Sequence, residues 1–193
     1  MLPGNIIYVA IFVSLIAYFF YFKNIFYGST KPNLVSWFIW MLAPMLGFFF
    51  NIKAGAGLSS LPVFLAGFGP LVVIIVSILN KNAYWKLTAF DFICGVFALF
   101  ALVLYVFTHN LEISIIFVIL SDGLAAVPTI VKSWHFPETE TSAIYFAGIF
   151  AQILALLIIK DWLFSIYALN IYFIIINIVI VFSIYRKRIF ISI

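Results

Sequence analysis

Residues 113–131 read ISIIFVILSDGLAAVPTIV, a run of nineteen residues in which Asp122 is the only charged side chain. A helix crosses about 30 Å of hydrocarbon at 1.5 Å per residue, so roughly 20 mostly apolar residues span a bilayer. Backbone N–H and C=O groups cannot stay unpaired in lipid, and an isolated spanning segment is therefore helical. This run predicts a transmembrane helix with a carboxylate near its centre.

Six further runs of similar length and composition lie along the chain. The seven predicted spans are Ile6–Phe22, Leu34–Phe50, Leu61–Leu79, Leu87–Phe107, Ile113–Val131, Thr141–Ile159 and Trp162–Tyr185. Over 193 residues the chain is 67% hydrophobic and 8% charged, whereas soluble domains are about a quarter charged. We therefore predict an all-α integral membrane protein with seven transmembrane helices, in a single membrane domain over residues 1–193.

Lys and Arg residues are unevenly divided between the two ends of the predicted spans. Alternate breaks belong to alternate sides of the membrane, and one side carries eight basic residues while the other carries two. The eight are Lys23, Lys31, Lys81, Lys86, Lys132, Arg186, Lys187 and Arg188. Basic residues accumulate on the cytoplasmic side, so we predict an outside N-terminus and a cytoplasmic C-terminus. We expect a cell membrane location (plasma or inner membrane) and no nucleic-acid partner.

The breaks after the first and fifth spans resemble each other. A shift of 105 residues aligns Pro32 with Pro137 and Trp40 with Tyr145, and a shift of 109 residues gives a second, competing register. Spans 1–3 and spans 5–7 begin on the same side, so we predict two parallel three-helix repeats joined by a linker helix. Parallel repeats occur in transporters, with the substrate site near mid-membrane. The predicted division is 1–80, 81–110 and 111–193.

Pro128 and Thr129 close the fifth span, and Thr139 and Glu140 follow eleven and twelve residues after Pro128. This pattern resembles that of the SWEET sugar transporters and their PQ-loop relatives. In those proteins a Pro-Thr or Pro-Gln pair closes the first helix of a repeat, and Ser-Thr-Glu precedes the next helix. The motif covers residues 121–142, and the topology resembles the family over the whole chain. The resemblance implies a three-one-three arrangement of seven helices with an outside N-terminus.

Asp122 is the most informative polar residue. A carboxylate near the bilayer centre is costly unless it faces protein or a water-filled cavity. Asp122 therefore marks either a substrate or proton site, or a structural contact with Ser, Asn or Trp groups on neighbouring helices. Gln152 and Asn177 lie near mid-depth of the sixth and seventh spans, where an interhelical hydrogen bond is the alternative to substrate contact.

The resemblance implies substrate contacts from a Trp on the second helix of a repeat and an Asn on the third. Trp37 or Trp40, and Asn177, match these positions by helix and depth. The alternative for both Trp residues is anchoring at the membrane interface. The predicted substrate-binding set is Asp122, Asn177, Trp37, Trp40, Gln152 and Tyr145.

Prolines within the spans are candidate hinges because they interrupt the backbone hydrogen-bond ladder and bend a helix. Pro70 follows Gly67 and Gly69 in the third span, and this segment is either a hinge or a site of close helix packing. The predicted motif and gating residues are Pro44, Pro70, Pro128 and Thr129.

These observations favour a transporter or facilitator of a small polar solute that is sugar-, amino-acid- or vitamin-like, with proton coupling left open. The alternative is a receptor, sorting or assembly factor on the same scaffold, and a channel or membrane enzyme ranks below both. Asp91 and Asp122 lack the Gly-x-Gly-Asp context of an intramembrane aspartyl protease. We expect lipid and solute as partners, with a homo-oligomer left open.

No cofactor and no metal site is expected. Cys94 is the only cysteine. The two histidines, His109 and His135, lie in predicted loops on opposite sides of the membrane. This set does not supply the four clustered ligands of a structural zinc site.

Overall fold

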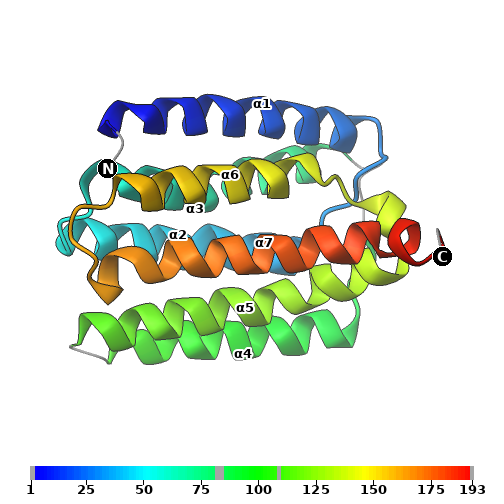
Figure 1. Cartoon of the computed structure of the whole chain (residues 1–193). Coiled ribbons are helices and arrows are strands. Elements are labelled where there is room, and N and C mark those ends of the chain that lie inside the picture. Colours follow the sequence, from blue (N-terminus) through cyan, green and yellow to red (C-terminus); the bar gives the residue numbers. More distant parts are fainter. Residues whose placement is uncertain (1–2, 81–84, 108–109, 192–193) are drawn as a thin grey trace.

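The computed structural model describes residues 3–80, 85–107 and 110–191 as a bundle of helices (Figure 1). The α-helices are α1 (Ile7–Phe26), α2 (Leu34–Lys53), α3 (Leu61–Leu79), α4 (Ala89–Val106), α5 (Leu111–His135), α6 (Ala143–Ile158) and α7 (Phe164–Ile191). Short 3-10 turns precede α1, α3 and α6, at Gly4–Ile6, Gly57–Ser60 and Pro137–Thr139. No strand occurs among these described residues, and the predicted all-α class is confirmed.

The helices have the length and surface of membrane spans. Within the described ranges, five segments are long and apolar enough to cross a bilayer: Gly4–Phe26, Leu34–Lys53, Gly57–Leu79, Leu111–His135 and Phe164–Arg186. Ala89–Leu104 of α4 and the whole of α6 are apolar but shorter. Large apolar side chains face outward, for example Phe12 and Phe19 at 65% and 66% exposure, as a lipid-facing surface requires. The chain is a multi-pass helical membrane protein.

The helices make contacts both within each half of the chain and between the two halves. α3 contacts both α1 and α2, and α7 contacts both α5 and α6. The pairs α1–α6 and α2–α5 join the first half of the chain to the second. α4 packs on α5 and more lightly on α2, at the edge of the bundle opposite α1 (Figure 1).

Glycines bring α3 close to its neighbours. A Cβ atom on Gly67 would lie 2.6 Å from Cγ and 2.9 Å from the backbone N of Met45 on α2. A Cβ atom on Gly69 would overlap the phenol ring of Tyr18 on α1. Both glycines therefore permit close helix packing, one of the two roles considered for this segment, and the hinge remains a prediction.

The breaks after α1, α3 and α5 meet at one end of the bundle, which we call the basic end (residues 27–33, 80 and 136–142). The Lys31 N–H donates to the Thr139 carbonyl at 3.0 Å. The Asn80 amide donates to the carbonyls of Ile25 and Phe26 at 2.7 and 3.0 Å. Of the eight basic residues counted for this side, Lys31 lies in these segments and Lys23 lies in the last turn of α1.

Several of the eight basic residues counted for these breaks lie in helices, with Lys23 in α1 and residues 186–188 in α7, and Lys132 needs the largest correction. Lys132 does not lie in a loop, because α5 continues four residues beyond the predicted end of the fifth span, to His135. Its side chain points inward and is 1% exposed. Lys132 is therefore a buried helical residue, and the charge asymmetry rests on the other basic residues.

Candidate functional site

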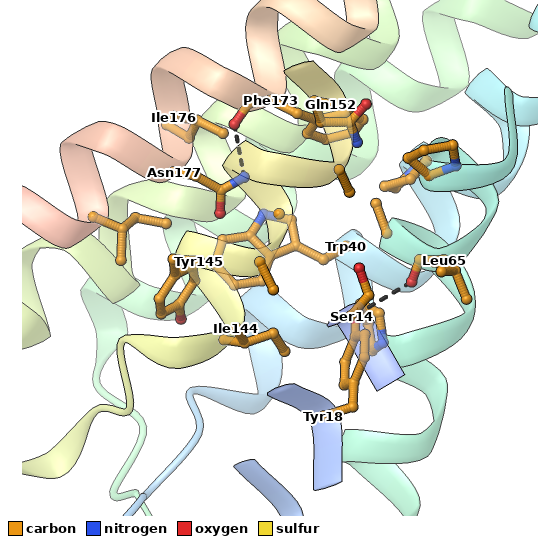
Figure 2. Close-up of a pocket in the computed structure, with 18 of the residues that line it drawn as sticks. Ser14, Tyr18, Trp40, Leu65, Ile144, Tyr145, Gln152, Phe173, Ile176 and Asn177 are labelled. Atoms are coloured by element: carbon orange, nitrogen blue, oxygen red, sulfur yellow. Dashed lines mark hydrogen bonds between the residues drawn. The ribbon is translucent and has the colours of Figure 1, made fainter. Parts of the chain in front are cut away.

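A cavity of about 90 Å³ lies between the middle parts of α1, α2, α3, α5, α6 and α7 (Figure 2). All six predicted substrate-binding residues line it: Asp122, Asn177, Trp37, Trp40, Gln152 and Tyr145. Pro44 and Pro70, two of the predicted hinge residues, line it as well. Pro128 and Thr129 are buried in α5 outside this lining. The structure thus brings the candidate residues together, and solute binding by them remains a prediction.

Among the residues that the structure describes, Asp122 carries the one carboxylate of the cavity lining, and it is 2% exposed. Its Oδ2 accepts a hydrogen bond from the Tyr172 hydroxyl at 2.7 Å. Its Oδ1 is buried without a hydrogen-bond partner among the described residues. Its backbone carbonyl accepts from Trp40 Nε1 at 3.3 Å. A buried acceptor left unpaired is unfavourable, so this oxygen is available to a ligand or a proton.

The two Trp residues form an aromatic wall of the cavity. Trp37 and Trp40 are 2% and 8% exposed, so neither anchors the protein at the membrane interface. Their rings meet edge to face, with centroids 5.3 Å apart. Trp37 Nε1 is a second buried group without a partner in the part of the chain that the structure describes. The wall therefore includes one free donor, and the same cavity lining includes the free acceptor of Asp122.

The two amides of the lining differ in their contacts. Gln152 Oε1 on α6 accepts from Asn170 Nδ2 on α7 at 2.9 Å, which is the interhelical bond considered as its structural role. Asn177 Nδ2 donates to the Phe173 carbonyl in its own helix at 2.7 Å, as the dashed line in Figure 2 shows. The Asn177 side chain is therefore held at the cavity by its own helix.

Two tyrosines belong to this region although the sequence did not single them out. Tyr18 lines the cavity, and its hydroxyl donates to the Leu65 carbonyl at 3.2 Å (Figure 2). Tyr172 supplies the bond to Asp122. A Tyr in the middle of an apolar span was the available signal, because a buried phenol hydroxyl requires a partner.

A buried ion pair lies where the basic end adjoins the cavity. Lys132 Nζ lies 2.5 Å from Glu140 Oε2, and the two side chains are 1% and 0% exposed. Glu140 Oε1 accepts from the hydroxyls of Tyr21 at 2.6 Å and Tyr145 at 3.2 Å. Lys132 also donates to the Lys31 carbonyl at 2.7 Å. Tyr145 belongs to both the cavity and this group, so the two regions are contiguous.

Further hydrogen bonds join the α1–α2 break to the α5–α6 break. The hydroxyls of Thr30 and Thr141 lie 2.5 Å apart, and Asn24 Nδ2 donates to Thr141 Oγ1 at 2.9 Å. At the opposite end, α1 and α6 meet through apolar side chains only slightly exposed, namely Ile7, Ala10, Ala151, Leu154 and Ala155. The two ends of the α1–α6 contact are thus polar and apolar, respectively.

Asp91 lies outside the cavity and has a structural role. Its Oδ1 accepts from Asn33 Nδ2 at 2.7 Å, and its Oδ2 accepts from the N–H and hydroxyl of Thr88 at 2.5 and 2.8 Å. The Asn33 side chain also caps α2 by accepting from the N–H groups of Val35 and Ser36. Asp91 therefore fixes the start of α4 against the start of α2.

No three His, Cys, Asp or Glu side chains are placed to hold a metal ion within residues 3–80, 85–107 and 110–191. His109 lies outside these ranges. Neither a protein-family model nor a curated protein nor a solved structure matches the chain. The site is therefore interpreted from its own geometry.

Proposed function

We propose that the protein is a transporter or facilitator of a small polar solute that binds in the central cavity. The convergence of Asp122, Gln152 and Asn177, from three different helices, on one cavity carries this proposal. A few placed polar groups between aromatic and apolar walls are typical of ligand pockets. A solute or proton at the free Asp122 oxygen would offset the cost of burying it in the membrane.

The proposed architecture is two parallel three-helix units, residues 1–80 and 111–193, with α4 as the linker. The helix contacts support it. The third helix of each unit touches the first and second, and the contacts α1–α6 and α2–α5 are equivalent when the units are exchanged. This is the pattern that an approximate two-fold axis along the membrane normal would give. The resemblance to the SWEET and PQ-loop families, which have this architecture, is part of the same proposal.

Alternating access would proceed by rocking of the two units around the cavity. The bond from the Tyr21 hydroxyl to Glu140 and the bond from Lys132 Nζ to the Lys31 carbonyl tie the units together at the basic end. At the opposite end, a cluster of buried apolar side chains joins α1 to α6. We propose that the structure is closed at the basic end. Because ordinary ligand pockets measure roughly 300–1,000 Å³, a cavity of about 90 Å³ must widen for most solutes.

Uptake by proteoliposomes tests the function. We expect wild-type protein to accumulate at least one solute from a panel of sugars, amino acids and amines. Asp122→Asn should reduce uptake by at least about 10-fold, since a hydrogen bond to a charged group contributes about 1.5–3 kcal/mol. The fold should survive, because an amide is cheaper to hold in the membrane than a carboxylate.

The matched control is Asp161→Asn, which removes the same charge from an exposed residue between α6 and α7. Uptake is measured at pH 5.5 and 7.5 for both variants and wild type. Unchanged uptake and pH profile in Asp122→Asn, together with a lower melting temperature, would assign Asp122 a structural role. Solute binding without any uptake would favour the alternative of a receptor, sorting or assembly factor.

We further propose that the basic end is cytoplasmic and that the N-terminus is outside, in the cell membrane. Lys53→Cys, at the exposed end of α2 opposite the basic end, should be labelled by an impermeant thiol reagent in intact cells. Glu138→Cys, exposed at the basic end, should be labelled only after permeabilisation. The native Cys94 is 8% exposed and should give little background. The reverse labelling pattern would invert the topology.

A further inference from the structure

We infer that the solute is a small organic cation whose ammonium group binds at Asp122, an inference that rests on the proposed solute site. Asp122 Oδ1 is buried and unpaired among the described residues, and Oδ2 accepts only the neutral hydroxyl of Tyr172. Neither oxygen has a positively charged partner, because no salt bridge to Asp122 is formed in that part of the chain. The carboxylate therefore lacks the counter-charge that buried carboxylates normally have.

The charge of the cavity lining has one sign. No Lys, Arg or His lines it among the described residues, whereas Asp122 does. The ammonium group of the buried Lys132 forms an ion pair with Glu140 and donates to the Lys31 carbonyl, so it does not neutralise Asp122. When Asp122 is ionised the cavity is therefore negative, and the low dielectric of the interior strengthens its attraction for a cation. The same field excludes an anion.

Most hydrogen-bond donors of the cavity are already engaged. Trp40 Nε1, the hydroxyls of Tyr18 and Tyr145, and Asn177 Nδ2 all donate within the protein. Among the described residues, the unpaired buried groups of the lining are the Asp122 Oδ1 acceptor and the Trp37 Nε1 donor. A primary ammonium, with three N–H groups and no acceptor, can donate to the Asp122 oxygen.

The walls supply a second attraction for a cation. The lining includes the rings of Tyr18, Trp37, Trp40, Tyr145 and Phe173. The faces of aromatic rings attract ammonium groups, and Trp attracts them most strongly. A carboxylate beside aromatic walls recognises an ammonium by charge and by ring faces together. Because the ring faces would bind an organic cation but contribute nothing to binding a proton, we infer an organic cation as the ligand.

Binding of matched probes to the purified full chain at pH 7.5 tests the inference. Ethanolamine and 1-propanol are alike in size but differ in charge, and choline and 3,3-dimethyl-1-butanol form a larger pair. We expect each cation to bind about 10- to 100-fold more tightly than its neutral partner, and the anion glycolate not to bind. In Asp122→Asn the ratio should fall to at most about 5-fold, because the carboxylate charge is gone and only the attraction of the ring faces remains.

Tyr172→Phe provides a second variant in case Asp122→Asn does not fold. It keeps the carboxylate and removes the one hydrogen bond that its side chain accepts within the described residues, so the preference for the cations should persist. Equal binding of a cation and its neutral partner by wild type would overturn the inference, as would glycolate binding or the absence of saturable cation binding.

Uptake of the same probes separates this inference from the proposed function. Cation binding that depends on Asp122, without uptake of any probe, would support the ligand class and contradict transport. Uptake of a neutral polar solute with no preference for the cations would support transport and contradict the ligand class.

Discussion

Glu140→Ala is expected to lower the free energy of unfolding by about 3–5 kcal/mol, because removing one member of a buried ion pair leaves the other charge uncompensated. Glu140 and Lys132 are 0% and 1% exposed, and their charged atoms lie 2.5 Å apart. The variant would also remove the acceptor of the Tyr21 and Tyr145 hydroxyls. Both effects lower the free energy of unfolding. Thermal unfolding of the purified protein in detergent is the measurement.

Glu138→Ala is the matched control, because Glu138 lies two residues away in the same break but is exposed. Its effect should stay within about 0.5 kcal/mol. Glu140→Leu combined with Lys132→Met should recover much of the loss, since an apolar pair of similar volume avoids the cost of burying charge. Equal destabilisation by Glu140→Ala and Glu138→Ala would show that the ion pair does not hold the basic end together.

The sequence predicted the helices well because hydrophobic length is a local property. The fifth span was placed at residues 113–131, and α5 extends over Leu111–His135. The extension matters because it carries Lys132, whose inward position depends on contact with Glu140 across the break. A polar residue at the end of an apolar run looks like the start of a loop when its partner is unknown. Lys132 was therefore counted as a loop charge.

Some residues that line the cavity could be predicted from their depth in the membrane. Asp122, Gln152 and Asn177 were selected as polar residues near mid-span, and residues at similar depth on packed helices tend to meet. The Tyr21–Glu140 bond depends instead on two residues 119 positions apart, brought together by the contact of α1 with α6. Pro128 and Thr129 were selected through a family resemblance, and they are buried in α5 but are not part of the cavity lining. No local pattern encodes these tertiary relations.

Gly69→Ala is expected to block the cavity and reduce solute binding by at least about 10-fold. The new methyl group would overlap the phenol ring of Tyr18, which lines the cavity (Figure 2). The ring has to move, and the cavity beside it is the available space. Since that cavity measures about 90 Å³, a displaced ring leaves little room for a solute. Binding of ethanolamine to the purified protein, or of whichever solute the uptake panel identifies, is the measurement.

A second substitution at Tyr18 distinguishes blockage from a general loss of structure. Tyr18→Leu combined with Gly69→Ala shortens the side chain that clashes, and binding should recover relative to Gly69→Ala alone. The coupling between the two sites follows from the double-mutant cycle. Gly123→Ala is the control, because its Cβ would lie 3.5 Å from the Tyr172 hydroxyl, an ordinary contact. That variant should be as stable as wild type or more so, since Ala favours a helix interior over Gly. Additive effects of the Gly69 and Tyr18 substitutions would contradict the assignment, because two residues that compete for the same space must be coupled.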